Sequence, residues 1–152
     1  MGCDIHSFAE QFIDGKWVEI NCKEPFRARN YGVFAFLANV RNYSAITPIS
    51  EPRGLPKDLT TWWVKEYREY GDYHTPSWLS IKELSEFNYD QEMEDRRVTR
   101  QVSKNIWYGA ATAEPGKGLK MTYREFLGQS FFKDLQELID CGAERVVFWF
   151  DN

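Results

Sequence analysis

The chain has 152 residues, of which 43% are hydrophobic and 28% charged, and its formal net charge is −4. The length predicts a single domain over residues 1–152 that buries about two-thirds of its unfolded surface. The acidic balance disfavours binding to duplex nucleic acid, because proteins of that class usually carry a basic surface. No apolar run approaches the roughly 18 residues that cross a bilayer, which disfavours a membrane protein.

Aromatic residues are abundant, with 6 Trp, 8 Tyr and 11 Phe. A chain of this size does not readily bury all of these rings, so some are expected to line a pocket or a subunit interface. The alternative is a core that is rich in aromatic side chains.

The three cysteines, Cys3, Cys22 and Cys141, are an odd number without the spacing of a metal site, a pattern typical of a reducing cytosol. Asp4 and Glu10 do not fit a secretory leader. We therefore expect a cytoplasmic protein, and no motif predicts a bound cofactor.

The first predicted element is a strand over residues 3–13. Asp14-Gly15 is a strong hairpin signal, and residues 16–20 fit the return strand. Successive side chains of a strand point to opposite faces. One face of the first strand is therefore expected to carry Asp4, His6, Phe8 and Glu10.

A short apolar helix over residues 33–38 is predicted next, with Asn30 as its cap. Residues 39–57 lack periodicity and contain several prolines, so a long ordered loop is expected. Loops of this length in compact domains are usually functional or disordered.

A helix over residues 58–70 should be stopped by Gly71. A loop is expected over residues 72–77, and Ser80 to Glu83 form a capping box that opens another short helix. Residues 88–105 are heavily charged with poor periodicity, which favours a helix or a lid.

Thr122 to Glu125 form a second capping box. The helix that it starts is expected to end at Gly142 and to bury six apolar side chains: Phe126, Leu127, Phe131, Leu135, Leu138 and Ile139. Residues 145–150 are a nearly continuous apolar run, which predicts a strand covered on both faces. The pattern predicts an α+β fold, with helices packed on a small, mostly antiparallel sheet of the N-terminal hairpin and the C-terminal strand.

The long loop is the preferred candidate for a binding site. It combines arginines, an amide and a tyrosine with prolines that reduce its freedom. Arginine pairs bidentately with phosphate, tyrosine stacks on a base and asparagine can read a base edge. The alternative is that these side chains cap helices and pair with acidic residues. The predicted ligand-binding set contains Tyr31, Arg41, Asn42, Tyr43, Arg53 and His74.

A metal site is the second candidate. The Asp-x-His pair near the start and a later Gly-Asp-x-His segment resemble fragments of the binuclear metallophosphoesterases, in which metal activates water. That family needs further histidines, and this chain has only two. Two histidines with several carboxylates could still hold one ion, or both histidines could hydrogen-bond structural neighbours. The predicted ligands are Asp4, His6, Glu10, Asp72 and His74.

Six segments that span nearly the whole chain form a fairly specific set. They are the opening Met-Gly-Cys-Asp-Ile-His, Arg41–Tyr43 with Glu51–Pro56, Ser77–Leu79, Tyr123–Gly128 and Phe148–Asn152. The set resembles a widespread family of small bacteriophage-encoded proteins. Phages also encode compact oligomeric "sponge" proteins that sequester cyclic nucleotide signals of bacterial immunity, and the small size, acidity and Arg-Tyr-Pro loops are similar to that class. The resemblance implies the cytoplasm of an infected bacterium.

We therefore expect a phage counter-defence (anti-CBASS) protein that binds and sequesters a nucleotide second messenger of the cyclic dinucleotide type, without catalysis. The alternatives are a metal-dependent hydrolase of the phosphodiesterase type and an inhibitor of a host protein. The apolar run 146–150 and the Trp62-Trp63 pair predict a homo-oligomer, either a dimer or a tetramer.

Overall fold

The computed structural model describes residues 2–59, 61–69, 71–103 and 106–152, and the side chains of all of these except 61, 99–103 and 106–110. These residues form two compact units. Unit 1 contains Met1–Arg29, Glu51–Phe87 and Gln129–Asn152, and unit 2 contains Asn30–Ser50 and Asn88–Gly128. The single domain over residues 1–152 stays a prediction.

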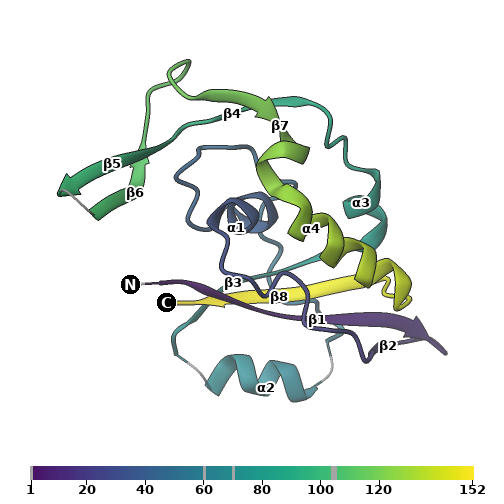
Figure 1. The fold of residues 1–152 in the computed structure, drawn as a ribbon. Helices are drawn as coiled ribbons and strands as arrows, with labels where there is room; N and C mark the ends of the chain where they lie inside the picture. Colours follow the sequence, from purple (N-terminus) through teal and green to yellow (C-terminus); the bar gives the residue numbers. More distant parts are fainter. Residues whose placement is uncertain (1, 60, 70, 104–105) are drawn as a thin grey trace. The chain divides into compact units, whose positions relative to one another are not determined.

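Unit 1 is built on a four-stranded antiparallel sheet (Figure 1). The strand order is β2 (Lys16–Glu19), β1 (Asp4–Ile13), β8 (Arg145–Asp151) and β3 (Tyr73–Ser80). The predicted α+β fold is confirmed, with the N-terminal hairpin and the C-terminal strand in one mostly antiparallel sheet. Strand β8 lies inside the sheet because its apolar residues 146–150 are at most 1% exposed and need cover on both faces.

The β1–β2 hairpin follows directly from its turn residues. Asp14 and Gly15 have φ values of 50° and 77°, and the flanking Ile13 and Lys16 are paired. A two-residue turn with both central residues at positive φ matches the twist of the strands, which is why Asp-Gly is favoured there. The predicted hairpin is confirmed.

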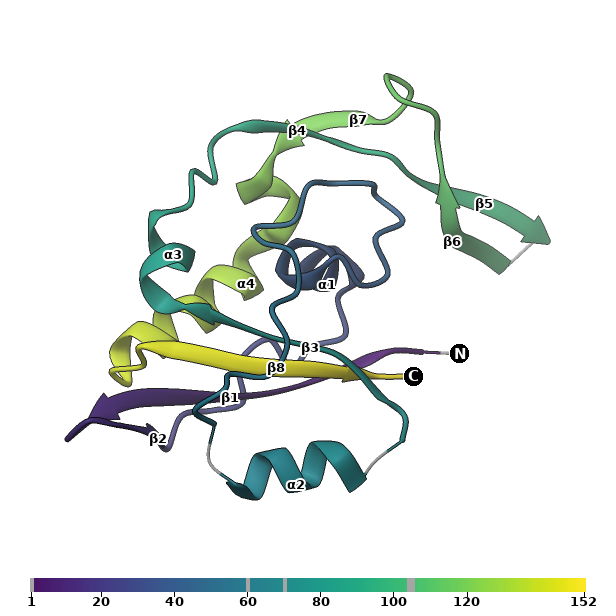
Figure 2. The same ribbon diagram turned by 180° about the vertical axis from the view of Figure 1, so that it is seen from behind.

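Helices cover both faces of this sheet in unit 1 (Figures 1 and 2). Helix α2 (Thr61–Glu69) lies on one face, and the part of α4 (Tyr123–Asp140) that belongs to unit 1 lies on the other. Helix α3 (Ile81–Glu86) follows β3, and its predicted Ser80–Glu83 capping box is present. Residue 70, where we expected α2 to end, lies outside the described residues.

Aromatic rings make up most of the core between α2 and the sheet. Trp63 of α2 stacks on Phe8 with ring centroids 4.3 Å apart, and both Trp63 and Tyr67 meet Trp149 edge-on at 5.6 Å. Such pairs add about 0.5–1.5 kcal/mol each beyond area burial. Some of the many aromatic residues therefore form a core, which is the alternative that the composition left open.

A disulfide joins the loop after β2 to the end of α4. Cys22 and Cys141 are bonded, with Cα atoms 6.1 Å apart, whereas Cys3 is a buried cysteine outside this disulfide. The cysteine count indicated reduced thiols and did not predict this pairing, because partners 119 residues apart are brought together only by the fold.

Unit 2 contains α1 (Tyr31–Ala38), two strand pairs and the first turn of α4. Asn30 caps α1 by accepting hydrogen bonds from the backbone of residues 32 and 33, as predicted. The strand pairs are β4 (Glu92–Asp95) with β7 (Leu119–Thr122), and β5 (Arg97–Ser103) with β6 (Ile106–Thr112).

Three sequence-based assignments were wrong. Residues 88–105 are not a helix, since β4 and most of β5 lie there; 104 and 105 are outside the described residues. Residues 72–77 are mostly the start of β3 rather than a loop. Phe126 and Ile139 were expected to be buried, but Phe126 is only partly buried and the surface of Ile139 is 42% exposed. Helix α4 is broken at Gly128, whose φ of 79° lies outside the helical region.

No helix among the described residues is both long enough and apolar enough to cross a membrane.

Candidate functional site

The side of the sheet that faces α2 carries a buried ion pair and two pockets. Strand alternation places His6, Phe8 and Glu10 on this side, opposite Trp149, Val147 and Arg145 of β8 in the ladder. The face that we predicted for Asp4, His6, Phe8 and Glu10 therefore packs against α2 at Phe8. Two pockets of opposite character open on this side.

A buried ion pair lies between the strands of this face. Arg145 Nε donates to Glu10 Oε1 at 2.7 Å, and Arg145 Nη1 donates to Asp58 Oδ1 at 3.0 Å. Burial raises the pKa of Glu10, and the hydrogen bond from Arg145 opposes that rise. Glu10 Oε2 and Arg145 Nη2 are buried without a hydrogen-bond partner among the described residues.

The first pocket, called here the arginine–tryptophan pocket, has a volume of about 540 Å³. This volume lies within the usual range for small-molecule sites, about 300–1,000 Å³. Its walls combine two indoles, three cations and one carboxylate with apolar loop residues: Trp17, Arg53, Leu55, Pro56, Lys57, Asp58, Trp78 and Arg145.

Arg53 is held in a fixed position on the wall of this pocket. Its guanidinium donates two hydrogen bonds to Glu83, at 2.9 and 2.5 Å, and lies 4.7 Å from the ring centre of Trp78. Burial raises the pKa of Glu83, but hydrogen bonds from Arg53 and Ser80 outweigh it and hold that pKa below its ordinary value. The predicted loop arginine therefore presents a preorganised guanidinium.

A second guanidinium, from Arg145, and the ammonium group of Lys57 complete the pocket. Arg145 lies 3.9 Å from the ring centre of Trp17. Lys57 is exposed on the rim. Two indole faces next to three cations provide surfaces for an aromatic ring and for anionic groups.

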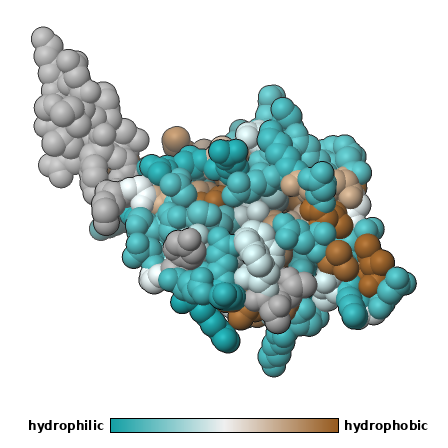
Figure 3. All heavy atoms as spheres, turned by 90° about the horizontal axis from the view of Figure 1, so that it is seen from below, coloured by the Kyte–Doolittle hydropathy of each residue, from teal (hydrophilic) through white to brown (hydrophobic). Residues whose placement is uncertain are grey.

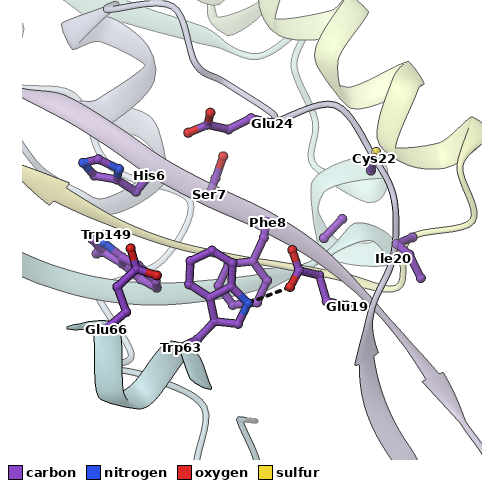
Figure 4. Close-up of a pocket in the computed structure, with 11 residues that line it drawn as sticks. His6, Ser7, Phe8, Glu19, Ile20, Cys22, Glu24, Trp63, Glu66 and Trp149 are labelled. Carbon is purple, nitrogen blue, oxygen red and sulfur yellow. Dashed lines mark hydrogen bonds between the residues drawn. The ribbon is translucent and has the colours of Figure 1, made fainter. Parts of the chain in front are cut away.

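The second pocket, called here the acidic pocket, has a volume of about 270 Å³ and opens beside β1 and α2 (Figure 4). Three carboxylates and three aromatic rings lie among its walls: Glu19, Glu24, Glu66, Phe8, Trp63 and Trp149. His6, Ser7, Ala9, Ile20 and Cys22 complete them. The Trp63 indole N–H donates to Glu19 Oε2 at 2.8 Å, which fixes one wall.

The five predicted metal ligands lie in unit 1 but do not form a cluster. Asp4 accepts two hydrogen bonds from Arg29, at 2.8 and 2.7 Å, and this bonding lowers its pKa. His6 Nε2 lies 2.5 Å from Asp151 Oδ2. No group of three or more His, Cys, Asp or Glu side chains that could hold a metal ion occurs among the described residues.

The remaining two predicted metal ligands, His74 and Asp72, also have positions that do not indicate a metal site. His74 contacts Thr75 Oγ1 at 2.9 Å and Asn152 Oδ1 at 3.3 Å, so its ring joins β3 to the C-terminus. Asp72 is exposed in the turn before β3. Both histidines thus contact structural neighbours, the alternative that the sequence left open.

Unit 2 brings three of the predicted ligand-binding residues together. The Arg41 guanidinium lies 5.7 Å from the ring centre of Tyr31, and its Nη1 donates to Tyr43 Oη at 3.1 Å. Arg97, which sequence reasoning missed, lies 5.8 and 5.7 Å from the same two rings. Asn42 has a structural role: its amide bonds Asn39 and the backbone of residue 46.

The predicted set is therefore divided. Tyr31, Arg41, Asn42 and Tyr43 belong to unit 2, and Arg53 and His74 belong to unit 1. Sequence reasoning missed most of the arginine–tryptophan pocket: Trp17, Lys57, Trp78 and Arg145. A single arginine at the start of the apolar run 145–150 was a signal, because a charge inside a two-sided strand needs a buried partner.

Comparison with protein-family models, with curated proteins and with solved structures finds no match to this chain.

Proposed function

We propose that this protein binds and sequesters a nucleotide-type small molecule in the arginine–tryptophan pocket. The observation that carries the proposal is the pairing of two guanidinium–indole contacts, Arg53 with Trp78 and Arg145 with Trp17, around one cavity of about 540 Å³. Indole faces stack on bases, and guanidinium groups bind phosphate oxygens.

The hydrogen bonding and charge of Arg145, Lys57 and Arg53 support an anionic ligand. Arg145 Nη2 is a buried donor without an acceptor among the described residues, and a phosphate oxygen would satisfy it. Lys57 on the rim forms no ion pair with another described residue, so it would add its full charge. Because Arg53 is already oriented by Glu83, little side-chain entropy would be lost on binding.

The resemblance to small bacteriophage proteins supports a biological role for this binding in counter-defence. We propose a cyclic dinucleotide-type signal of bacterial immunity as the ligand, bound without turnover in the cytoplasm of the infected cell. Removal of the signal would then be the counter-defence activity.

Calorimetry of the full chain with a panel of cyclic dinucleotides, cyclic ADP-ribose, AMP and inorganic phosphate tests the proposal. Lys57→Ala should weaken binding about fivefold, and Trp17→Leu should weaken it about tenfold through lost stacking. Lys133→Ala removes the same charge from an exposed position of α4 and should leave affinity unchanged. No binding by folded protein to any member of the panel would refute the proposal.

The Tyr31–Arg41–Tyr43–Arg97 cluster of unit 2 is a second candidate location for the same ligand class. Two guanidiniums beside two phenol rings favour it. Arg41→Ala and Lys57→Ala distinguish the locations, since only the variant at the true site should lower affinity.

We also propose that the chain forms a homo-oligomer. The Trp62 surface is 61% exposed, whereas the apolar run of β8 is buried and supplies no interface. The β1–β2 hairpin, at the edge of the sheet, exposes Phe12, Ile13 and Val18 by 40–49%. Figure 3 shows hydrophobic residues (brown) on the surface seen from below. Edge strands with apolar side chains favour pairing with another chain. Light scattering of the purified protein should give a dimer or tetramer mass; a monomer mass would refute it.

A further inference from the structure

The acidic pocket carries a second set of observations that the proposed function does not use. Its carboxylates come from three different elements: Glu19 from β2, Glu24 from the loop that follows, and Glu66 from α2. None of the described residues that line it is a lysine or an arginine. The pocket therefore holds three carboxylates, and His6 is the one basic side chain among the described residues of its walls.

The walls between these carboxylates are rigid aromatic surfaces. Trp63 is fixed from both sides, because it stacks on Phe8 at an interplanar angle of 7° and donates its N–H to Glu19. Trp149 meets it at an angle of 62°. The Trp63 indole is partly exposed and provides a surface against which C–H groups and a cation can pack.

Two buried polar atoms of this pocket lack a partner among the described residues. They are the acceptor Glu66 Oε2 and the donor Trp149 Nε1, and Trp149 is only 1% exposed. Figure 4 shows Glu66 reaching from α2 toward Trp149 and His6. Buried polar groups are nearly always hydrogen-bonded, so an unmatched donor and an unmatched acceptor in one cavity indicate an occupant that supplies both functions.

The occupant is not a bare metal ion, because no described group of three or more ligating side chains is close enough to hold one. Carboxylates spread around a cavity suit an extended organic cation instead. A pure amine would satisfy Glu66 but could not accept from the Trp149 N–H, since a protonated amine has no lone pair. Hydroxyl groups supply that acceptor.

We propose that the acidic pocket binds a small hydroxylated ammonium compound of the amino sugar class. The ammonium group pairs with Glu66, a ring hydroxyl accepts from Trp149 Nε1, and the C–H face of the sugar packs on Trp63. A volume of about 270 Å³ accommodates a single sugar ring. This site is chemically independent of the arginine–tryptophan pocket.

The test is a titration of the full chain with glucosamine, followed by calorimetry and by tryptophan fluorescence, because two indoles line the pocket. Glucosamine should bind at least about tenfold more tightly than glucose, which lacks the charge, and than putrescine, which lacks the oxygen. Equal affinity for all three, or no binding to folded protein, would overturn the proposal.

Variants locate the effect. Glu66→Gln should lower glucosamine affinity at least about tenfold. Glu69→Gln removes the same charge from an exposed position of the same helix and should leave affinity unchanged. Equal losses in the two variants would mean unspecific attraction and would refute the site. Trp149→Phe, checked by circular dichroism, should weaken glucosamine more than putrescine, whereas an equal effect would refute the role of the indole N–H.

Lys57→Ala should not change glucosamine binding. Loss of nucleotide binding with retained glucosamine binding, or the reverse, therefore separates failure of one proposal from failure of the other.

Discussion

The two pockets of unit 1 share tryptophan walls but differ in charge. In the arginine–tryptophan pocket both guanidiniums are paired with carboxylates, Arg53 with Glu83 and Arg145 with Glu10, although Arg145 Nη2 has no hydrogen-bond partner among the described residues. In the acidic pocket, Glu66 Oε2 and the Trp149 N–H have no partner among the described residues. Indole surfaces thus provide shape in both places, and the neighbouring charges decide which ligand class each place favours.

The largest expected effect comes from the buried pair that supports the arginine–tryptophan pocket. Arg145→Met leaves Glu10 buried without its cation and should lower the free energy of unfolding by about 3–5 kcal/mol. Urea denaturation measures this. The double variant with Glu10→Leu should recover most of the loss, because no buried charge remains; a loss as large as that of the single variant would contradict this role.

Reduction of the disulfide should affect the acidic pocket, since Cys22 lines it. Cys22→Ser with Cys141→Ser should lower the free energy of unfolding by about 2–4 kcal/mol. Thermal unfolding with and without reductant measures it. The wild type should lose stability in reductant and the double variant should not; insensitivity of the wild type would show that this bond contributes nothing.

Acid should weaken the ion pair between Glu83 and Arg53, which holds the Arg53 guanidinium in place. The pKa of Glu83 is lowered in the folded state, so its contribution is present above the ordinary value of 4.5 and is lost as the pH falls through the folded pKa. The pair is partly exposed, so we expect a contribution of about 1 kcal/mol. Denaturation from pH 7 to 3 should show a smaller acid loss for Glu83→Gln than for the wild type, and identical pH profiles would contradict it.

The smallest effect is expected at the wall of the acidic pocket. Trp63→Phe keeps a ring on Phe8 but loses the hydrogen bond to Glu19, which should lower the free energy of unfolding by about 1 kcal/mol. Nucleotide binding in the other pocket should not change. Equal weakening of both ligands would show that the two pockets are not independent.

Local signals predicted the local structure well. The Asp14-Gly15 turn, the cap at Asn30 and the Ser80–Glu83 capping box are present, because each depends on residues within a few positions of one another. The apolar run 146–150 also predicted a strand with two covered faces, since a stretch without polar residues leaves no side for water.

Pairings between distant segments could not be predicted in this way. Strand β3 was missed because Thr75 has φ 52° and the ladder with β8 shifts register between His74 and Ser77, so no regular alternation marks it. The charged residues 92–95 and 97–103 form strands because β7 and β6 supply their hydrogen-bond partners.

The candidate sites divide along the same line. The sequence by itself determined that arginines, prolines and tryptophans would be available near residue 53, and that carboxylates and a histidine would share a face of β1. Only the tertiary structure decided that Glu10 accepts a hydrogen bond from Arg145 and that the Arg53 guanidinium lies over the Trp78 ring. It also decided that Glu66 and Trp149 line the same cavity. The reason is physical: residue type fixes what a side chain can bind, whereas its actual partner depends on which distant strands and helices pack beside it.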